Sequence, residues 1–203
     1  TKTDNAGGTT YGWADNDRMV SVTLPSGTVT YTYDADGNKV AVDDGAEARM
    51  YLVDMLQPYA QVIAEHKGVG APTAQYVYGL ERISQNRAGA VSFFIADGQG
   101  SIRELTNSTG DVTDTYSYLA FGEELARTGT TVNNFKFVGE EIDPNLGFSY
   151  NRARWYNMSN GRFISVDPFV GDINAPVSLH RYLYGNQSPV SFNDPTGKFT
   201  LMS

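Results

Sequence analysis

The sequence predicts a mostly β protein built from antiparallel strand–turn–strand repeats, with little helix. Three observations lead to this expectation: side chains that alternate with a period of two, turn clusters rich in Gly and Asp, and a recurring Tyr-x-Tyr element. The composition agrees, because 13 Tyr, 10 Phe and 21 Gly among 203 residues favour strands joined by many turns. Such a repeat predicts a sheet whose units stack on their neighbours.

The clearest predicted hairpin lies near the N-terminus. Residues 28–33 alternate Thr with Val or Tyr and meet the turn cluster 34–38, after which 39–42 form a second strand. The Asp-Gly step inside the cluster sets the predicted register. An earlier strand is predicted at 19–24, closed by Pro, Ser and Gly at 25–27.

Similar segments follow along the chain. We predict further strands, each ended by a Gly-containing turn or leading into one, at 60–66, 74–78, 91–96, 101–106 and 112–118. Residues 50–56 are instead predicted as a helical turn, which Pro58 stops. Residues 139–144 are predicted as a short turn segment.

Tyr-x-Tyr pairs make the repeat concrete. They occur at 31/33, 76/78, 116/118 and 182/184. Because residues i and i+2 of a strand share a face, each pair presents two rings on one side of the sheet. The favoured interpretation is a structural ladder of rings between neighbouring hairpins. The alternative is a platform on which sugars or bases stack.

Charge and composition exclude several classes of protein. With 15 Lys and Arg against 23 Asp and Glu, the formal net charge is −8, which argues against phosphate-neutralising nucleic-acid binding and against a polybasic membrane surface. The chain has no Cys, so disulfides and thiolate chemistry are excluded. Its only two histidines, His66 and His180, are far apart in the sequence, and we expect structural roles for them, no metal site and no cofactor.

Targeting signals are not visible in this sequence. There is no apolar run long enough to span a membrane as a helix and no secretory leader at the first residues. The chain does not begin with Met, which suggests that it is a piece of something longer.

A longer string of motifs resembles a known family. It runs through FFIADGQGSIRELTNSTGDV (93–112), TYSYLAFGEEL (115–125), FKFVGEEIDPNLGFSYNRARWYNMSNGRFISVDP (135–168) and NDPTG (193–197). The earlier segment YTYDADGN (31–38) is similar to a Tyr-Asp repeat unit. Together these resemble the Rhs repeat-associated core, the C-terminal end of Rhs and Tyr-Asp-repeat proteins.

The resemblance implies a curved β ribbon that forms part of a hollow β-shell around a C-terminal toxin or effector. The implied partners are this cargo polypeptide, the shell repeats that precede the core, and a component of a secretion system or toxin complex. The implied location is secreted or on the surface of a bacterium. We expect three segments: degenerate repeats at 1–92, the core at 93–198, and the start of the cargo or tail at 199–203.

In the family, the core cuts the chain just after an Asp-Pro-x-Gly-x motif. The resemblance maps the two Asp-Pro aspartates onto Asp167 and Asp194, and the arginine of an Arg-x-Tyr-Tyr motif onto Arg154. The implied cut lies between Lys198 and Phe199, although many members carry an apolar residue where Lys198 stands.

The paired carboxylates fit this chemistry. A cut of the aspartic-protease type needs one carboxylate as a base on water and a second, kept protonated by burial and by its neighbour, as an acid. A guanidinium such as that of Arg154 can orient a carboxylate, and Arg162 is a second candidate for this role. Pro195 and Gly197 complete the cleavage motif.

Each of these residues also has a purely structural interpretation. Asp-Pro is a common turn dipeptide, and Asp143-Pro144 is assigned to a turn. Arg154 could equally form a structural ion pair in a shell wall. The alternative functions are therefore a surface adhesion or carbohydrate-binding module with outward tyrosines, and a scaffold whose cleavage site is inactive.

Overall fold

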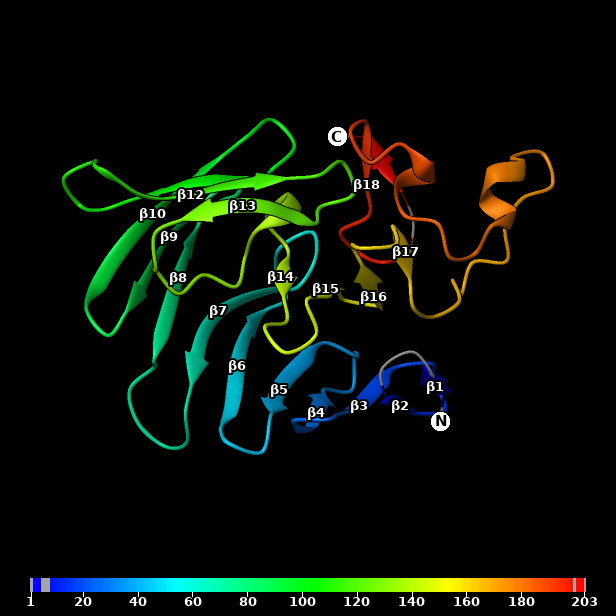
Figure 1. The fold of residues 1–203 in the computed structure, drawn as a ribbon, viewed down its shortest axis with the longest axis horizontal. Helices are drawn as coiled ribbons and strands as arrows, with labels where there is room; N and C mark the ends of the chain where they lie inside the picture. Colours follow the sequence, from blue (N-terminus) through cyan, green and yellow to red (C-terminus); the bar gives the residue numbers. More distant parts are fainter. Residues whose placement is uncertain (1, 5–7, 199, 203) are drawn as a thin grey trace. The chain divides into compact units, whose positions relative to one another are not determined.

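The computed structural model describes residues 2–4, 8–198 and 200–202, and the chain divides into two compact units, Thr1–Gln75 and Tyr76–Ser203. In the described residues, strands dominate and the only helices are short 3-10 turns. The prediction of antiparallel strand–turn–strand repeats with little helix is therefore confirmed (Figure 1).

The first unit is a sheet whose strands pair antiparallel in sequence order (Figure 1). Its strands are β1 (Lys2–Asp4), β2 (Thr9–Trp13), β3 (Met19–Leu24), β4 (Gly27–Tyr33), β5 (Lys39–Asp43), β6 (Ala48–Asp54), β7 (Gln61–His66) and the beginning of β8 (Ala74–Tyr78). Alternation decides the faces, because Val29 and Tyr31 are buried while the threonines between them are exposed.

The second unit continues the same strand order and then changes character. After the end of β8 come β9 (Arg82–Arg87), β10 (Ala90–Ala96), β11 (Ile102–Thr106), β12 (Val112–Tyr118) and β13 (Glu124–Thr128). A smaller sheet follows, of β14 (Glu141–Ile142), β15 (Ser149–Asn151), β16 (Arg154–Asn157) and β17 (Arg162–Phe163). The short helices are η1 (Phe137–Gly139), η2 (Pro176–Leu179) and η3 (Gly185–Gln187), and β18 (Phe192–Asn193) pairs with β19 (Leu201–Met202).

A five-residue turn explains the glycine-rich clusters. In each copy, the first residue's N–H bonds to the fifth residue's carbonyl and the glycine at position four bonds back to the first carbonyl. These glycines have φ between 72° and 93°, a conformation that glycine adopts without a steric penalty. This is the turn of three-residue hairpin loops, and it places a bulge in most of the flanking strands. The copies are 34–38, 97–101, 107–111, 119–123 and 136–140.

The tyrosine pairs do share a face in three strands. Tyr31, Tyr76 and Tyr116 are buried, and the second ring of each pair is half-buried. In the second unit the contacts of these rings include phenylalanines: Tyr76 meets Phe135 edge-on with centroids 5.0 Å apart. The ring partners of Tyr76 and Tyr118 thus include residues of the segment after β13.

Three local predictions differ from the structure. Residues 50–56 lie largely in β6, because the ladders with β5 and β7 outweigh the helix preference of Met and Leu. Within 139–144, Glu141–Ile142 is strand β14. Tyr182 and Tyr184 are not in a strand: Leu183 forms an isolated bridge to Arg162, and η3 follows.

The core that positions the site is aromatic. Tyr156 and Tyr184 are fully buried and stack with centroids 4.1 Å apart at 20°. Phe137, Met158 and Phe163 complete this cluster. It lies directly beside the residues of the candidate site, because Tyr156 is on β16, Phe163 is on β17 and Tyr184 precedes β18.

Replacing Tyr156 with Ala should destabilise this unit strongly. The ring is fully buried and its hydroxyl donates to the carbonyl of Phe121 at 2.8 Å. We expect the free energy of unfolding to fall by about 3–5 kcal/mol, measured by denaturant titration. Leu125→Ala is the control, because Leu125 is 64 % exposed and its loss should cost no more than about 0.5 kcal/mol. Equal effects of the two variants would contradict the assignment of this core.

Candidate functional site

The structure brings Arg154, Asp167 and Asp194 together. Arg154 begins β16, Asp167 lies in the loop after β17, and Asp194 directly follows β18. The Nη2 atom of Arg154 lies 2.6 Å from Oδ2 of Asp167 and 3.1 Å from Oδ2 of Asp194. One nitrogen therefore binds both carboxylates. The two aspartates have 26 residues between them in the sequence, and the fold brings them together.

Arg154 uses its whole guanidinium group. Nη1 donates to the carbonyl of Arg181 at 3.1 Å, and Nε donates to the carbonyl of Gly197. Its planar face stacks on Phe163, with Cζ 3.7 Å from the ring centroid. Burial lowers the pKa of Arg154, and the two carboxylates oppose this effect. A guanidinium remains charged under such conditions, so the site holds a permanent buried cation.

Asp194 is the buried member of the carboxylate pair. It is 1 % exposed, and burial raises its pKa to about 6, with Asp167 adding to the rise and Arg154 opposing it. Its Oδ1 accepts the backbone N–H of Lys198 at 3.2 Å and the hydroxyl of Thr196 at 3.3 Å. In mildly acidic solution this carboxyl keeps a proton that an ordinary aspartate has already lost.

Asp167 is less buried, and its backbone is fixed from both sides. Its side chain retains 15 % exposure. Its N–H donates to the carbonyl of Arg181 at 2.9 Å, while Nε of Arg181 donates to the carbonyl of Asp167 at 2.9 Å. Oδ1 accepts the N–H of Phe169 at 2.8 Å and Oδ2 binds Arg154. The pair is thus asymmetric, with one carboxylate deep and one near solvent.

The predicted cleavage motif folds around Asp194. The N–H of Gly197 approaches the carbonyl of Asp194 at 3.4 Å, and Pro195 is buried. Gly197 has φ +66° and is pressed so closely against the carbonyl of Asn151 that a Cβ would lie 2.3 Å from that oxygen. Lys198 is exposed at the end of this turn. Phe199, the predicted residue after the cut, lies outside the described residues.

Sequence reasoning did not identify Asn151, Arg152 and Arg181. Asn151 is 1 % exposed and donates to the carbonyl of Asp194 at 2.6 Å, while its Oδ1 accepts the hydroxyl of Ser149 at 2.8 Å. Arg152 donates to the buried Glu140 at 2.9 Å and to the carbonyl of Pro195. Arg152 and Asn151 lie in the NRARWY motif, which was the available signal; Arg181 had none.

Other candidates lie elsewhere. Arg162 is exposed, and no ion pair between described residues includes it. Asp143 caps a turn, as predicted, with Oδ1 accepting the N–H of Asn145 at 2.8 Å. His180 is exposed and His66 is half-buried in β7. Among the described residues no group of His, Cys, Asp and Glu could hold a metal ion.

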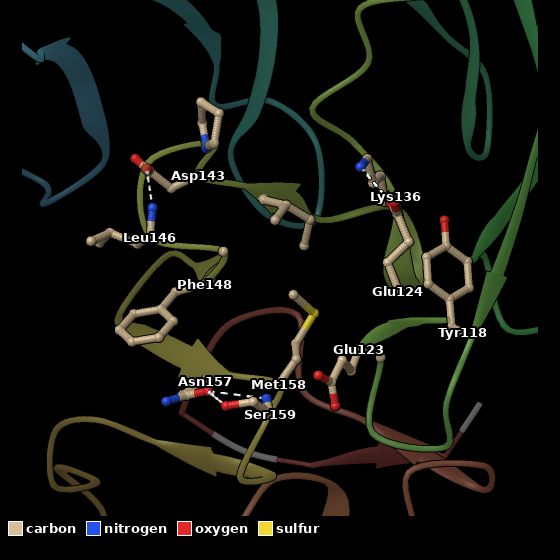
Figure 2. Close-up of a pocket in the computed structure, with 14 residues that line it drawn as sticks. Tyr118, Glu123, Glu124, Lys136, Asp143, Leu146, Phe148, Asn157, Met158 and Ser159 are labelled. Atoms are coloured by element: carbon tan, nitrogen blue, oxygen red, sulfur yellow. Dashed lines mark hydrogen bonds and ion pairs between the residues drawn. The ribbon is translucent and has the colours of Figure 1, made fainter. Parts of the chain in front are cut away.

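A cavity of about 440 Å³ lies next to the small sheet (Figure 2). Figure 2 shows the thioether of Met158 reaching into it, with Phe148 and Leu146 on one side and the ion pair of Lys136 and Glu124, 2.6 Å apart, on the other. None of its lining residues is Arg154, Asp167 or Asp194. The cavity is therefore distinct from the carboxylate site.

Comparison with known proteins matches this architecture. The RHS Repeat family model matches residues 13–48. The chain is 29% identical over 203 residues to the tRNA3(Ser)-specific nuclease WapA of Bacillus spizizenii, covering 95% of this chain and 8% of that protein. It is 31% identical over 119 residues to the double-stranded DNA deaminase toxin A of Burkholderia cenocepacia, covering 56% and 8%.

The fold also matches a solved toxin complex. The Photorhabdus luminescens Tc holotoxin pore superposes with a TM-score of 0.74 at 18% identity, covering 99% of this chain and 10% of that one. The chain therefore spans about a tenth or less of the length of these relatives. No helix in the described part of the chain is long and apolar enough to cross a membrane.

The fold combines antiparallel strands joined by recurring glycine turns with a small sheet of β14 to β17, and the two Asp-Pro segments lie in the loops after β17 and β18. These features define a β-repeat protein with the same fold as the matched part of the Tc holotoxin pore. The match of residues 13–48 to the RHS Repeat model, together with the similarity to WapA and to the Tc holotoxin pore, supports a relationship to the Rhs repeat family.

The raised pKa of Asp194 predicts a pH-dependent stability. Its folded pKa of about 6 lies above the ordinary value of 3.8, so its contribution to stability is fully present below 3.8 and is lost as the pH rises through 6. Asn at this position does not titrate. The stability of Asp194→Asn relative to wild type should therefore increase by about 1–3 kcal/mol between pH 4 and pH 7 in denaturant unfolding. A difference that is independent of pH would contradict the raised pKa.

Proposed function

We propose that this chain is the C-terminal core of an Rhs shell that carries a C-terminal toxin or effector and separates it by a single cut between Lys198 and Phe199. The observation that carries the proposal is one buried arginine joining two carboxylates, one deep and one near solvent, beside the Asp-Pro-Thr-Gly-Lys turn. The structural alternatives are an Asp-Pro turn and a simple ion pair of Arg154 in a shell wall. Neither of them requires a second carboxylate on Arg154 or the contact of Asp194 with Lys198.

The proposed reaction divides the work between the two carboxylates. Asp167 takes a proton from a water molecule, whose oxygen attacks the carbonyl carbon of Lys198. Asp194, protonated because of its raised pKa, donates to the carbonyl oxygen as the tetrahedral intermediate forms. Collapse breaks the C–N bond, and the amine of Phe199 leaves with a proton. Water is consumed, and a new carboxyl group and a new amine are formed.

Arg154 acts as the organiser in this scheme. It holds the Oδ2 atoms of Asp167 and Asp194 on the same nitrogen, so the two groups stay within reach of one water molecule. Through Nε it also fixes the carbonyl of Gly197, one residue before Lys198. An arginine is suited to this because its donors are rigid and its charge is permanent.

The shell role rests on the relatives. Their names are a tRNA-specific nuclease, a deaminase toxin and a Tc holotoxin pore, and this chain matches about a tenth or less of each. The proposed partners are the cargo that follows Lys198, the shell repeats that precede this core, and a component of a secretion system or toxin complex. The proposed location is secreted or on the bacterial surface, and the proposed boundaries are those of the three segments 1–92, 93–198 and 199–203.

Adhesion through exposed tyrosines is the less favoured function. Tyr31, Tyr76 and Tyr116 are buried. The hydroxyls of Tyr33 and Tyr118 donate to backbone carbonyls at 2.7 and 2.8 Å, so these rings are anchored to the sheet. Rings held in this way offer little free face for a sugar to stack on. The remaining alternative is a structural scaffold with an inactive cleavage site. It differs from our proposal only in that the bond between Lys198 and Phe199 stays uncut.

Intact mass of the purified chain tests the cut. We expect wild type with a C-terminal tag to yield a fragment ending at Lys198, while Asp194→Asn and Asp167→Asn stay whole because the acid or the base is missing. Arg154→Lys should slow the cut at least tenfold, since one ammonium cannot bind both carboxylates and the Gly197 carbonyl in the same geometry. A wild type that stays whole, or an Asp194→Asn variant that is cut equally, would refute the proposal.

The rate of cutting should also depend on pH. Because Asp194 must carry a proton, we expect the rate to fall as the pH rises above about 6, approaching a tenfold loss per pH unit. A time course of fragment formation between pH 5 and pH 8 measures this. A rate that increases steadily across this range would contradict the role of Asp194 as the acid.

A further inference from the structure

A four-residue turn meets the cleavage motif in a regular way. Asn151 Nδ2 donates to the carbonyl of Asp194, Arg152 Nη1 to that of Pro195, Ala153 N–H to that of Thr196, and Arg154 Nε to that of Gly197. In every one of these bonds the donor residue precedes the acceptor residue by 43 positions in the sequence. Every carbonyl from 194 to 197 is thereby bound, in order, by the hairpin turn between β15 and β16.

The donors of this turn are themselves fixed. The hydroxyl of Ser149 donates to Asn151 Oδ1 at 2.8 Å, which leaves the Nδ2 group of Asn151 directed at Asp194. Arg152 has φ +55°, a left-handed conformation that is rare for a residue with a side chain. Its Nη1 contacts both oxygens of the buried Glu140 at 2.9 Å. A strained residue anchored on a buried partner is typical of a functional constraint.

The fit on the acceptor side is equally tight. Gly197 would place a Cβ 2.3 Å from the carbonyl oxygen of Asn151 and 2.9 Å from the N atom of Arg154. Any side chain there would push the segment away from the turn. The contacts are made to backbone atoms, so they bind a chain of this shape whatever side chain follows Pro195.

We propose that the turn Asn151–Arg154 is a backbone clamp that sets the register of the cut, with Asn151 and Arg152 as positioning residues. This inference rests on the proposed self-cleavage. The bonds to four consecutive carbonyls keep residues 194–197 from sliding along the turn, because a shift by one residue would break all four bonds together. The clamp thereby holds Lys198 next to Asp194 and determines which peptide bond the carboxylates reach.

The test compares variants of the tagged full chain by intact mass over time, together with thermal unfolding. Asn151→Asp removes the Nδ2 donor, and Arg152→Met removes the donor to Pro195. We expect both to slow the cut at least tenfold and to produce fragments that end at residues other than Lys198. Arg152→Lys keeps a donor and should restore part of the rate at the original position. A merely structural role would change the unfolding temperature but not the position of the cut.

Matched controls lie on the same unit. Asn157→Asp makes the same chemical change on β16, where the side chain only accepts the N–H and hydroxyl of Ser159 through Oδ1. Arg127→Met removes an exposed arginine whose nearest carboxylate contact is 3.9 Å long. Both controls should cut like wild type.

The outcomes separate the two proposals. Folded Asn151→Asp and Arg152→Met variants that cut at the wild-type rate and only after Lys198 would overturn the clamp and leave the self-cleavage intact. A wild type that is never cut would overturn both. Should Asn151→Asp fail to fold, Arg152→Met decides the question alone, because the side chain of Arg152 retains 13 % exposure and tolerates replacement better than a fully buried residue.

Discussion

The buried guanidinium of Arg154 is the interaction on which the C-terminal part of this molecule depends. Three segments distant in the sequence, the loops at Asp167, Arg181 and Asp194, are joined by one side chain. A buried charge is costly unless it is paired, so the fold must bring both carboxylates to it. The buried aromatic cluster of Tyr156, Phe163 and Tyr184 lies beside these segments, and Phe163 packs against the face of the guanidinium.

Much of the fold follows from local sequence rules. Period-two alternation located most strands, and the Gly-containing clusters located the turns, because both are properties of short segments. Met50–Leu56 was misjudged because strand pairing on both sides overrides the helix preference of Leu and Met. The segment at Tyr182–Tyr184 was misjudged because its tyrosines look like a repeat pair, yet one ring is fully buried in the cluster and the other is 43 % exposed.

The site was predictable only in part. The family resemblance pointed to Arg154, Asp167 and Asp194, and the structure places both carboxylates within hydrogen-bonding distance of one nitrogen of Arg154. The NRARWY motif marked the neighbourhood of Asn151 but not its partner, and Arg181, which follows a His, carried no local signal at all. Their roles exist only because segments tens of residues apart are brought side by side, and such pairing is decided by tertiary structure.

The strand pair β18–β19 bears on what happens after a cut. Phe192 and Asn193 pair with Met202 and Leu201, so the proposed bond lies in the loop of a small hairpin whose two arms hold each other. Breaking that bond removes the covalent link but leaves the backbone pairing of β18 with β19 in place. Cutting the chain and releasing the segment after the cut would then be separate events, because the ladder of β18 and β19 must also come apart.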